Sequence, residues 1–252
     1  MQPQHSRCPS IAVVIPALDE HRTVGDVVRR TRAALRDSDS CSAIIIVVDD
    51  GSSDSTGRCA EEAGADRVLT NTSTLGLGAA VRRGLEEARR LGVDIVVKID
   101  SDLQHSPEDI PDLVAPIAAG AADLVFGDRF ERIGYRMPLV RRLGNRVFSR
   151  LMRQLTGWPV RDSQPGIFAG SRRYLDDFRI PEDYNYTQQV LIDGYQRSLR
   201  FRAVPVAFRE RGTGTSFISV RYLWKVPWAI AKMVLAVGPR ATTQGSHATT
   251  DS

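Results

Sequence analysis

The first half of the chain alternates short runs of β-branched apolar residues with stretches whose apolar residues recur at helical spacing. The apolar runs are IAVVI, AIIIVV, RVLT, DIVVKI and DLVF, which begin at residues 11, 43, 67, 94 and 123. The stretches of helical spacing are VGDVVRRTRAALR, the segment after DDGSSDST, GAAVRRGLEEARR and PEDIPDLVAPIAA. Because the apolar runs are nearly continuous in Val and Ile, they indicate parallel strands that helices cover on both faces. The pattern therefore predicts an α/β fold with a mostly parallel sheet.

Length and composition predict a single domain of this class. The chain has 252 residues, of which 42% are hydrophobic and 25% charged, and this is enough for one full core. We expect residues 1–10 to form an N-terminal extension, 11–217 the domain, 218–238 an amphipathic helical segment and 239–252 a flexible tail.

Charge and cysteine content favour a cytoplasmic protein that does not bind nucleic acid. The net charge of +4 is small, and no basic run is interleaved with aromatic residues. The first ten residues, MQPQHSRCPS, lack the apolar core of a secretory signal. Cys8, Cys41 and Cys59 are odd in number and scattered along the chain, which fits a reducing compartment.

Polar residues follow four of the predicted strands. They are the segments PALDE at residue 16, DDGS at 49, DSD at 100 and GDR at 127. The carboxyl ends of parallel strands form the crevice in which open α/β sheets bind ligands. A single acidic strand end is usually a turn or a helix cap, but four polar ends, two of them with paired acids, indicate a ligand and metal crevice.

The sequence KIDSDLQH places Asp100 and Asp102 one residue apart, directly after an apolar run. Two ionised carboxylates this close repel each other unless a positive group lies between or beside them. In an extended segment residues two apart face the same side, so both carboxylates are expected to address one ion. Mg²⁺ binds one or two carboxylates together with phosphate oxygens and water. The pair therefore predicts a Mg²⁺ or Mn²⁺ site.

Other phosphate or metal motifs are weak. The glycines of Gly76-Leu77-Gly78 are not followed by a third glycine at dinucleotide-fingerprint spacing, so a flexible turn into a helix from Ala79 competes with direct phosphate contact. The histidines at positions 5, 21, 105 and 247 have no ligand spacing and are expected to be solvated.

Four segments together resemble the family 2 inverting glycosyltransferases of GT-A fold, a Rossmann-like class. They are VIPALDE, VVDDGSSDST, LGLGAAVRRGL and KIDSDLQHSPEDIP, and the similarity extends in order from about Ile11 to Ser216. It is strongest to the dolichol- and polyprenyl-phosphate mannosyltransferase-like branch. The resemblance implies a GDP- or UDP-linked sugar donor, a metal on Asp100 and Asp102, and Gln104 beside them. It also implies that the base and ribose are held by Pro16, Ala17, Leu18, Glu20 and Asp50, and Asp49 and Gly76 are added as candidate substrate contacts.

The second half of the chain, which would bind the sugar acceptor, carries further similarity to the same family. The resemblance implies a phosphate contact by Arg129 and an acceptor loop at Asp162-Ser163-Gln164-Pro165-Gly166. The segment RERGTGTS, from Arg209 to Ser216, resembles a later loop of the family. Two positions depart from the family pattern: Phe217 stands where a lysine is expected, and the candidate contact Gln189 stands where relatives often have glutamate.

Two segments could meet a membrane. Arg142, Arg146, Ser149, Arg150 and Arg153 fall near one helical face, which is either an ordinary solvated face or a clamp for phosphates or anionic lipid. The segment FISVRYLWKVPWAIAKMVLAV, residues 217–237, is interrupted by charges and is not expected to cross a bilayer. It fits a helix at an anionic membrane surface, or a helix packed on the core.

The sequence therefore predicts a metal-dependent inverting glycosyltransferase that moves a sugar, mannose from GDP-mannose, to an isoprenoid phosphate. It would act in the cytoplasm as a peripheral protein on the inner face of the membrane. Two alternatives stay open. One is a soluble glycosyltransferase that acts on a hydroxyl of a small molecule or glycan, and the other is a non-catalytic module that binds nucleotide sugars.

Overall fold

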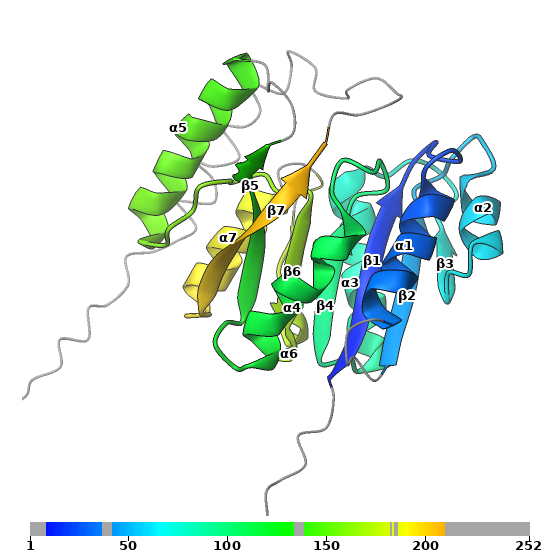
Figure 1. Ribbon diagram of the computed structural model, residues 1–252, viewed down its shortest axis with the longest axis horizontal. Coiled ribbons are helices and arrows are strands. Elements are labelled where there is room, and N and C mark those ends of the chain that lie inside the picture. The colour runs from blue at the N-terminus through cyan, green and yellow to red at the C-terminus, as the bar shows by residue number, and fades with distance from the viewer. Residues whose placement is uncertain (1–8, 37–41, 134–138, 182, 184–185, 210–252) are drawn as a thin grey trace, which may run out of the picture. The chain divides into compact units, whose positions relative to one another are not determined.

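The computed structural model describes residues 9–36, 42–133, 139–181, 183 and 186–209 (Figure 1). The helices and strands follow in the order β1 (Ser10–Ala17), α1 (Val24–Arg36), β2 (Ser42–Asp49), α2 (Thr56–Glu62), β3 (Arg67–Thr70), α3 (Leu77–Leu91), β4 (Ile95–Ile99), the 3₁₀ turn η1 (Pro107–Asp109), α4 (Ile110–Ala118), β5 (Leu124–Ile133), α5 (Leu139–Thr156), β6 (Ile167–Ser171), α6 (Arg172–Asp176), α7 (Tyr186–Gln196) and β7 (Phe201–Phe208). The described strands form one sheet in the order β3-β2-β1-β4-β6-β5-β7.

Only one of the described strands runs against the others. β6 is antiparallel to both of its neighbours, β4 and β5, whereas every other pair of neighbours is parallel. The carboxyl ends of β1, β2, β3, β4, β5 and β7 therefore share one edge of the sheet with the amino end of β6. This edge is where a ligand crevice is expected in an open α/β sheet.

Helices cover the sheet on both faces. In Figure 1, α1 and α4 lie on the near face, and α3, α6 and α7 lie on the far face. All seven residues of β1 from Ile11 to Ala17 are buried, as the unbroken apolar run predicted. One buried cluster joins Val13 and Ile15 of β1 to Val27 of α1 and Leu113 of α4.

The predicted fold class is confirmed, with a mostly parallel sheet in one compact unit. The five predicted strands correspond to β1 to β5, and the four predicted helical stretches correspond to α1 to α4. The analysis of periodicity did not identify β6, α6, α7 or β7. β6 has five residues with a glycine among them, and β7 includes Arg202 and Pro205, so neither forms a long apolar run.

Several predictions concern residues outside those described. The predicted helix at 218–238, the tail at 239–252 and most of the extension at 1–10 belong to this group. In the described part of the chain, no helix combines the length and the hydropathy that crossing a bilayer requires.

Candidate active site

The loops that follow β1 and β2 are bonded to each other. The amide of Asp19 donates to Ser52 Oγ at 3.0 Å, and the amide of Glu20 donates to Thr56 Oγ1 at 2.8 Å. In return, the carboxylate of Asp19 accepts from the amide of Ser53 at 2.8 Å. Asp19 has a φ of 53°, a conformation that Asp and Asn tolerate better than most residues. The two polar strand ends therefore form one rigid surface.

The predicted base and ribose contacts lie on or beside this surface. Pro16 and Ala17 are buried at the end of β1, with Ala17 opposite Asp49 of β2, and Leu18 is half-buried. Glu20 is also half-buried, and its carboxylate accepts from Thr23 Oγ1 at 2.7 Å. The structure thus brings together the residues that the resemblance assigned to the nucleotide.

The carboxylate of Asp50 holds the loop that precedes α3. It accepts from Asn71 Nδ2 at 2.6 Å, from the amide of Leu75 at 3.0 Å and from the amide of Gly76 at 2.7 Å. Its neighbour Asp49 accepts from the amide of Ser52 at 3.0 Å. Both acids are buried, so each stabilises loop geometry in addition to any contact with a ligand. The amide of Gly76 is taken by Asp50 and is not aimed at a phosphate.

Gly78 has a packing role rather than a phosphate-binding one. Helix α3 begins at Leu77, two residues earlier than expected, and the amide of Gly78 donates to the carbonyl oxygen of Asp183 at 2.9 Å. A Cβ on Gly78 would lie 2.5 Å from that same oxygen. The close approach of another segment of backbone therefore accounts for this glycine.

Asp100 lies beside Gly166, because Ile99 at the end of β4 pairs with Ile167 at the start of β6. The amide of Asp100 donates to the carbonyl oxygen of Gly166 at 3.1 Å. The carboxylate of Asp100 forms an ion pair with Lys98, whose ammonium also donates to the Gly166 oxygen at 3.1 Å. Burial alone would lower the pKa of Lys98, but the Asp100 carboxylate and Tyr186 raise it above its ordinary value. Lys98 is therefore charged, and it is the positive group beside the acidic pair.

The segment from Asp100 to Asp102 is a turn and not an extended strand, which corrects the geometry that we expected. β4 ends at Ile99, and Leu103 has a φ of 61°. The carboxylate of Asp102 accepts from the amide of Gln104 at 3.1 Å, as is common for an aspartate in a turn. The carbonyl oxygen of Gln104 accepts from the amide of Arg209 at 2.9 Å. The turn is thereby attached to the end of β7.

His105 is buried, which contradicts the expectation of a solvated ring. Its Nε2 accepts from the amide of Gly166 at 3.1 Å, and its ring lies edge-on to Phe208 with centroids 5.0 Å apart. Burial lowers the pKa of His105 well below its ordinary value, and the charges of Arg129 and Lys98 lower it further. The ring is therefore neutral. It joins the turn from Asp100 to Asp102, called the Asp-x-Asp turn below, to the predicted acceptor loop.

Arg129 is held by Asp162 of the predicted acceptor loop. Its guanidinium donates twice to the carboxylate, from Nε at 2.5 Å and from Nη2 at 2.9 Å. The side chains of Arg129 and Asp162 are only 15% and 1% exposed. The guanidinium also lies 4.9 Å from the ring centroid of Phe208, which His105 contacts from the turn. The predicted acceptor residues and the Asp-x-Asp turn therefore form one packed cluster.

The remaining candidates are more scattered. Gln189 is buried in α7, whose residues from Tyr186 to Gly194 are all buried, and Arg209 is exposed at the end of β7. Ser216 lies outside the described residues. On α5, Arg146, Arg150 and Arg153 are exposed together.

Ser149 does not belong to that arginine face, contrary to our prediction. It is 2% exposed, and its hydroxyl donates to the carbonyl oxygen of Arg161 at 2.9 Å.

The acidic turn fits a divalent metal that arrives with a phosphate ligand. Asp100 and Asp102 supply hard oxygen donors, and the Asp100 side chain is 30% exposed. Within the described part of the chain, no group of three or more His, Cys, Asp or Glu side chains is placed to hold a metal. Mg²⁺ commonly takes one or two carboxylates and completes its shell with phosphate oxygens and water. The donor set therefore suits a metal–diphosphate complex better than an all-protein metal cage.

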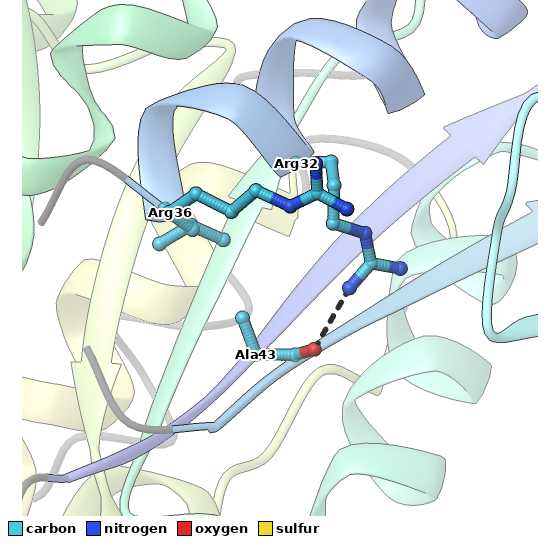
Figure 2. Close-up of a pocket in the computed structure, with 4 residues that line it drawn as sticks. Arg32, Arg36 and Ala43 are labelled. Carbon is cyan, nitrogen blue, oxygen red and sulfur yellow. Dashed lines mark hydrogen bonds between the residues drawn. The ribbon is translucent and has the colours of Figure 1, made fainter.

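A separate pocket lies where α1 ends and β2 begins, at the opposite edge of the sheet (Figure 2). It is lined by Arg32, Leu35, Arg36 and Ala43. Arg32 donates to the carbonyl oxygen of Ala43 at 3.0 Å and forms a 2.5 Å ion pair with Asp66. These contacts fix the end of α1 against the sheet, and the pocket carries no catalytic group.

The fold and this edge of polar strand ends define a GT-A-type, Rossmann-like glycosyltransferase. Residues 12–179 match the family described as Glycosyl transferase family 2, and the chain belongs to this family. The predicted family and the predicted class of enzyme are thereby confirmed.

Two relatives illustrate the similarity in sequence. A polyprenol monophosphomannose synthase from Mycolicibacterium smegmatis is 32% identical over 82% of this chain and 80% of its own length. A UDP-N-acetylglucosamine–dolichyl-phosphate N-acetylglucosaminyltransferase from Methanococcus voltae is 30% identical over 78% of this chain and 84% of its own length.

Solved structures share the fold. Glucosyl-3-phosphoglycerate synthase from Mycobacterium tuberculosis, crystallised with Mn²⁺, UDP and phosphoglyceric acid, is 28% identical, with a TM-score of 0.66. The match covers 90% of this chain and 78% of that one. Another structure of the same enzyme holds Mg²⁺ and UDP.

Sequence reasoning did not identify Lys98 or the buried role of His105. A lysine inside the otherwise apolar run DIVVKI was the available signal, because a charged residue at a buried strand position requires a partner. The contact of His105 with Gly166 depends on the pairing of β4 with β6 and leaves no local pattern.

Proposed function

We propose that the chain transfers mannose from GDP-mannose to a polyprenyl- or dolichyl-type phosphate, with inversion and with the help of Mg²⁺ or Mn²⁺. The observation that carries this proposal is the packed cluster at the sheet edge. There Asp100, on the predicted donor side, and Arg129, on the predicted acceptor side, are joined through Gly166, His105 and Phe208. In this proposal, the leaving diphosphate would bind beside Asp100, next to Arg129 as the cation for an incoming phosphate.

On the donor side, the joined loops after β1 and β2 would bind the nucleoside. Glu20 and Asp50 provide carboxylates, and Pro16 to Leu18 provide an apolar edge beside them. Breaking the sugar–diphosphate bond leaves additional negative charge on the nucleoside diphosphate. A divalent metal supplies charge stabilisation for that leaving group when it is bound. Asp100 and Asp102 would hold the metal, and Gln104 would fix the turn.

On the acceptor side, the site provides cations rather than a base. A phosphate monoester has a second pKa of about 6 and is already mostly ionised at neutral pH, so it is a competent nucleophile without proton removal. Gln189 is uncharged and buried, which fits a reaction that does not need a carboxylate base there. Arg129 would orient the phosphate, and Asp162 would orient Arg129.

The exposed face of α5 supports binding of the protein to an anionic membrane surface. Leu143 and Val147 are 64% and 58% exposed there, beside exposed Arg146, Arg150 and Arg153. Apolar and cationic side chains on one helix face are typical of helices that lie in the membrane interface. We propose that the protein is a peripheral enzyme at the cytoplasmic face, which agrees with relatives named as a dolichyl-phosphate N-acetylglucosaminyltransferase and a polyprenol monophosphomannose synthase.

The test is a transfer assay with the full chain. GDP-mannose, UDP-glucose and UDP-N-acetylglucosamine are each offered with a polyprenyl phosphate, the matching polyprenol or phosphoglyceric acid, in Mg²⁺, Mn²⁺ or excess chelator. We expect metal-dependent transfer from GDP-mannose to the polyprenyl phosphate and little transfer to the alcohol. Equal use of alcohol and phosphate would contradict the proposed acceptor.

One observation favours a second candidate, a soluble transferase that acts on a small molecule. The structural neighbour was crystallised with UDP and phosphoglyceric acid, which is a water-soluble phosphate compound. Efficient transfer from a UDP-sugar to phosphoglyceric acid in the same assay would favour this candidate. The cation at Arg129 suits either acceptor, so the assay and not the charge of the site distinguishes them.

A further inference from the structure

A fully buried ammonium lies against the Asp-x-Asp turn. Lys98 is 0% exposed, its Nζ lies 5.1 Å from the ring centroid of Tyr186, and it donates to Asp100 and to the carbonyl oxygen of Gly166. A buried lysine needs such partners because an uncompensated charge in the interior is costly. Because none of its surface is accessible, Lys98 is placed to act on a ligand through Asp100 and not by direct contact.

Lys98 changes the charge of the predicted metal site. Asp100 and Asp102 together carry two negative charges, and the ammonium in contact with Asp100 reduces the local sum to one. An ammonium in contact with Asp100 also repels a divalent ion bound to the same carboxylate. A diphosphate restores negative charge at the place where the metal would sit, and it offers additional oxygen ligands.

The ammonium also sets the direction of the carboxylate. Oδ1 of Asp100 is held by Lys98, and Oδ2 lies where a Cβ on Gly166 would be only 2.1 Å away. The carboxylate is thereby enclosed between the lysine of β4 and the glycine that precedes β6. One carboxylate oxygen is held by Lys98 and the other lies close to Gly166, so the carboxylate has a fixed direction while its side chain is 30% exposed.

We propose that Lys98 is a positioning residue and internal counterion that makes a divalent metal bind strongly only together with a nucleoside diphosphate. The inference rests on the metal-dependent transfer proposed above. Under it, Asp100 and Asp102 would take up the metal together with the nucleotide sugar and would release it together with the nucleoside diphosphate. The protein without nucleotide holds little metal at Asp100 and Asp102.

The experiment measures Mn²⁺ binding by electron paramagnetic resonance on the full chain, with Mn²⁺ alone and with Mn²⁺ plus GDP or UDP. For the wild-type protein we expect binding to be at least about a hundredfold weaker without nucleotide, because the net charge of the site is low. In Lys98→Met and Lys98→Gln, Mn²⁺ alone should bind roughly tenfold more tightly, because the repelling charge is gone. Lys98→Gln keeps a hydrogen-bond donor for the carbonyl oxygen of Gly166. It therefore serves as the second variant in case Lys98→Met does not fold.

Arg200→Met is the matched control. It removes a cation that donates to Asp123 at 2.8 and 2.9 Å at the opposite edge of the sheet, so an ion pair is lost without any change at Asp100. Mn²⁺ binding by this variant should equal that of the wild type. Thermal unfolding of all variants reports on their folding.

Several outcomes would overturn the inference. Unchanged or weakened binding of Mn²⁺ alone by folded Lys98 variants would do so, as would wild-type binding that is equally tight with and without nucleotide. The second result needs no variant. Absence of Mn²⁺ binding under every condition would overturn both the proposed metal role and this inference. The expected Mn²⁺ pattern with transfer only to a soluble acceptor would support Lys98 and overturn the lipid acceptor.

Discussion

Arg129 and Asp162 are joined by two hydrogen bonds of 2.5 and 2.9 Å, although they are 33 residues apart in sequence. Their pairing means that the cation predicted to meet the acceptor phosphate is oriented before any acceptor arrives. A planar guanidinium bound along one edge keeps its remaining N–H groups in a fixed direction. The acceptor side of the site is therefore preorganised by the loop that precedes β6.

Replacing Arg129 by Ala should raise the KM for the acceptor at least about tenfold, because a charge-assisted contact to phosphate is lost, and should change the KM for the donor much less. Stability should also fall, since Asp162 would remain buried without its partner. Steady-state kinetics with each substrate varied in turn checks the split. Arg200→Ala, which also removes the partner of a buried aspartate, is the control and should leave both KM values unchanged.

Replacing Asp102 by Asn should reduce turnover on the order of a hundredfold or more, because one charge that stabilises the metal and the leaving group is lost. The fold should persist, since an amide oxygen can still accept from the amide of Gln104. Asp112→Asn on the exposed side of α4 is the matched control. Near-normal metal-dependent turnover in Asp102→Asn would remove this residue from the site.

Replacing Gly166 by Ala should nearly abolish transfer. The new Cβ would lie 2.1 Å from Asp100 Oδ2 and 2.8 Å from His105 Nε2, so the turn and the acceptor loop could not both keep their positions. Gly144→Ala on α5 is the control. Apart from its chain neighbours and the backbone of its own helix, no atom of the described residues lies within 4 Å of a Cβ there, and alanine favours a helix by about 1 kcal/mol over glycine. Gly166→Ala should therefore have lower activity and lower thermal stability than Gly144→Ala. Equal activity of the two variants would contradict the close packing at Gly166.

Glu108 should contribute to stability above a defined pH. The hydrogen bond from Arg30, opposed by partial burial and assisted by Ser106, lowers the pKa of Glu108 from 4.5 to about 2. A carboxyl with a lowered pKa in the folded state stabilises the protein fully above its unfolded pKa and loses this contribution as the pH falls to the folded pKa.

The difference in unfolding free energy between the wild type and Glu108→Gln should therefore be constant above about pH 5 and disappear between pH 4.5 and about 2. Because the side chain is 54% exposed, solvent screening limits the difference to about 1 kcal/mol. Urea denaturation at a series of pH values measures it. A difference that grows as the pH falls would contradict the assigned ion pair.

The sequence predicted the parallel part of the fold well, because β1, β2 and β4 are buried on both faces and leave unbroken apolar runs. It also predicted the polar strand ends, since each follows directly on such a run. The reversal of β6 was not predictable from periodicity, because IFAGS is short and its partners are far away in sequence.

The same long-range pairing explains the errors at the site. His105 looked like a surface histidine because local sequence does not show that Gly166 and Phe208 enclose it. Asp100 and Asp102 were expected in an extended segment, but the chain turns as soon as β4 ends. Lys98 resolves the repulsion between the two acids from within the strand itself, which the sequence offered only as an isolated charge.

The reversed direction of β6 has a consequence for how enzymes with this fold can diversify. Because β6 starts at the crevice, the connection from α5 to β6 runs directly into the acceptor side, whereas the donor loops belong to β1, β2 and β4. A change in the length or sequence of this one connection can alter what is glycosylated without moving the nucleotide-binding loops. Gly166 limits such changes, because a Cβ at this position would collide with the carboxylate of Asp100. This residue must therefore remain a glycine wherever Asp100 keeps its place.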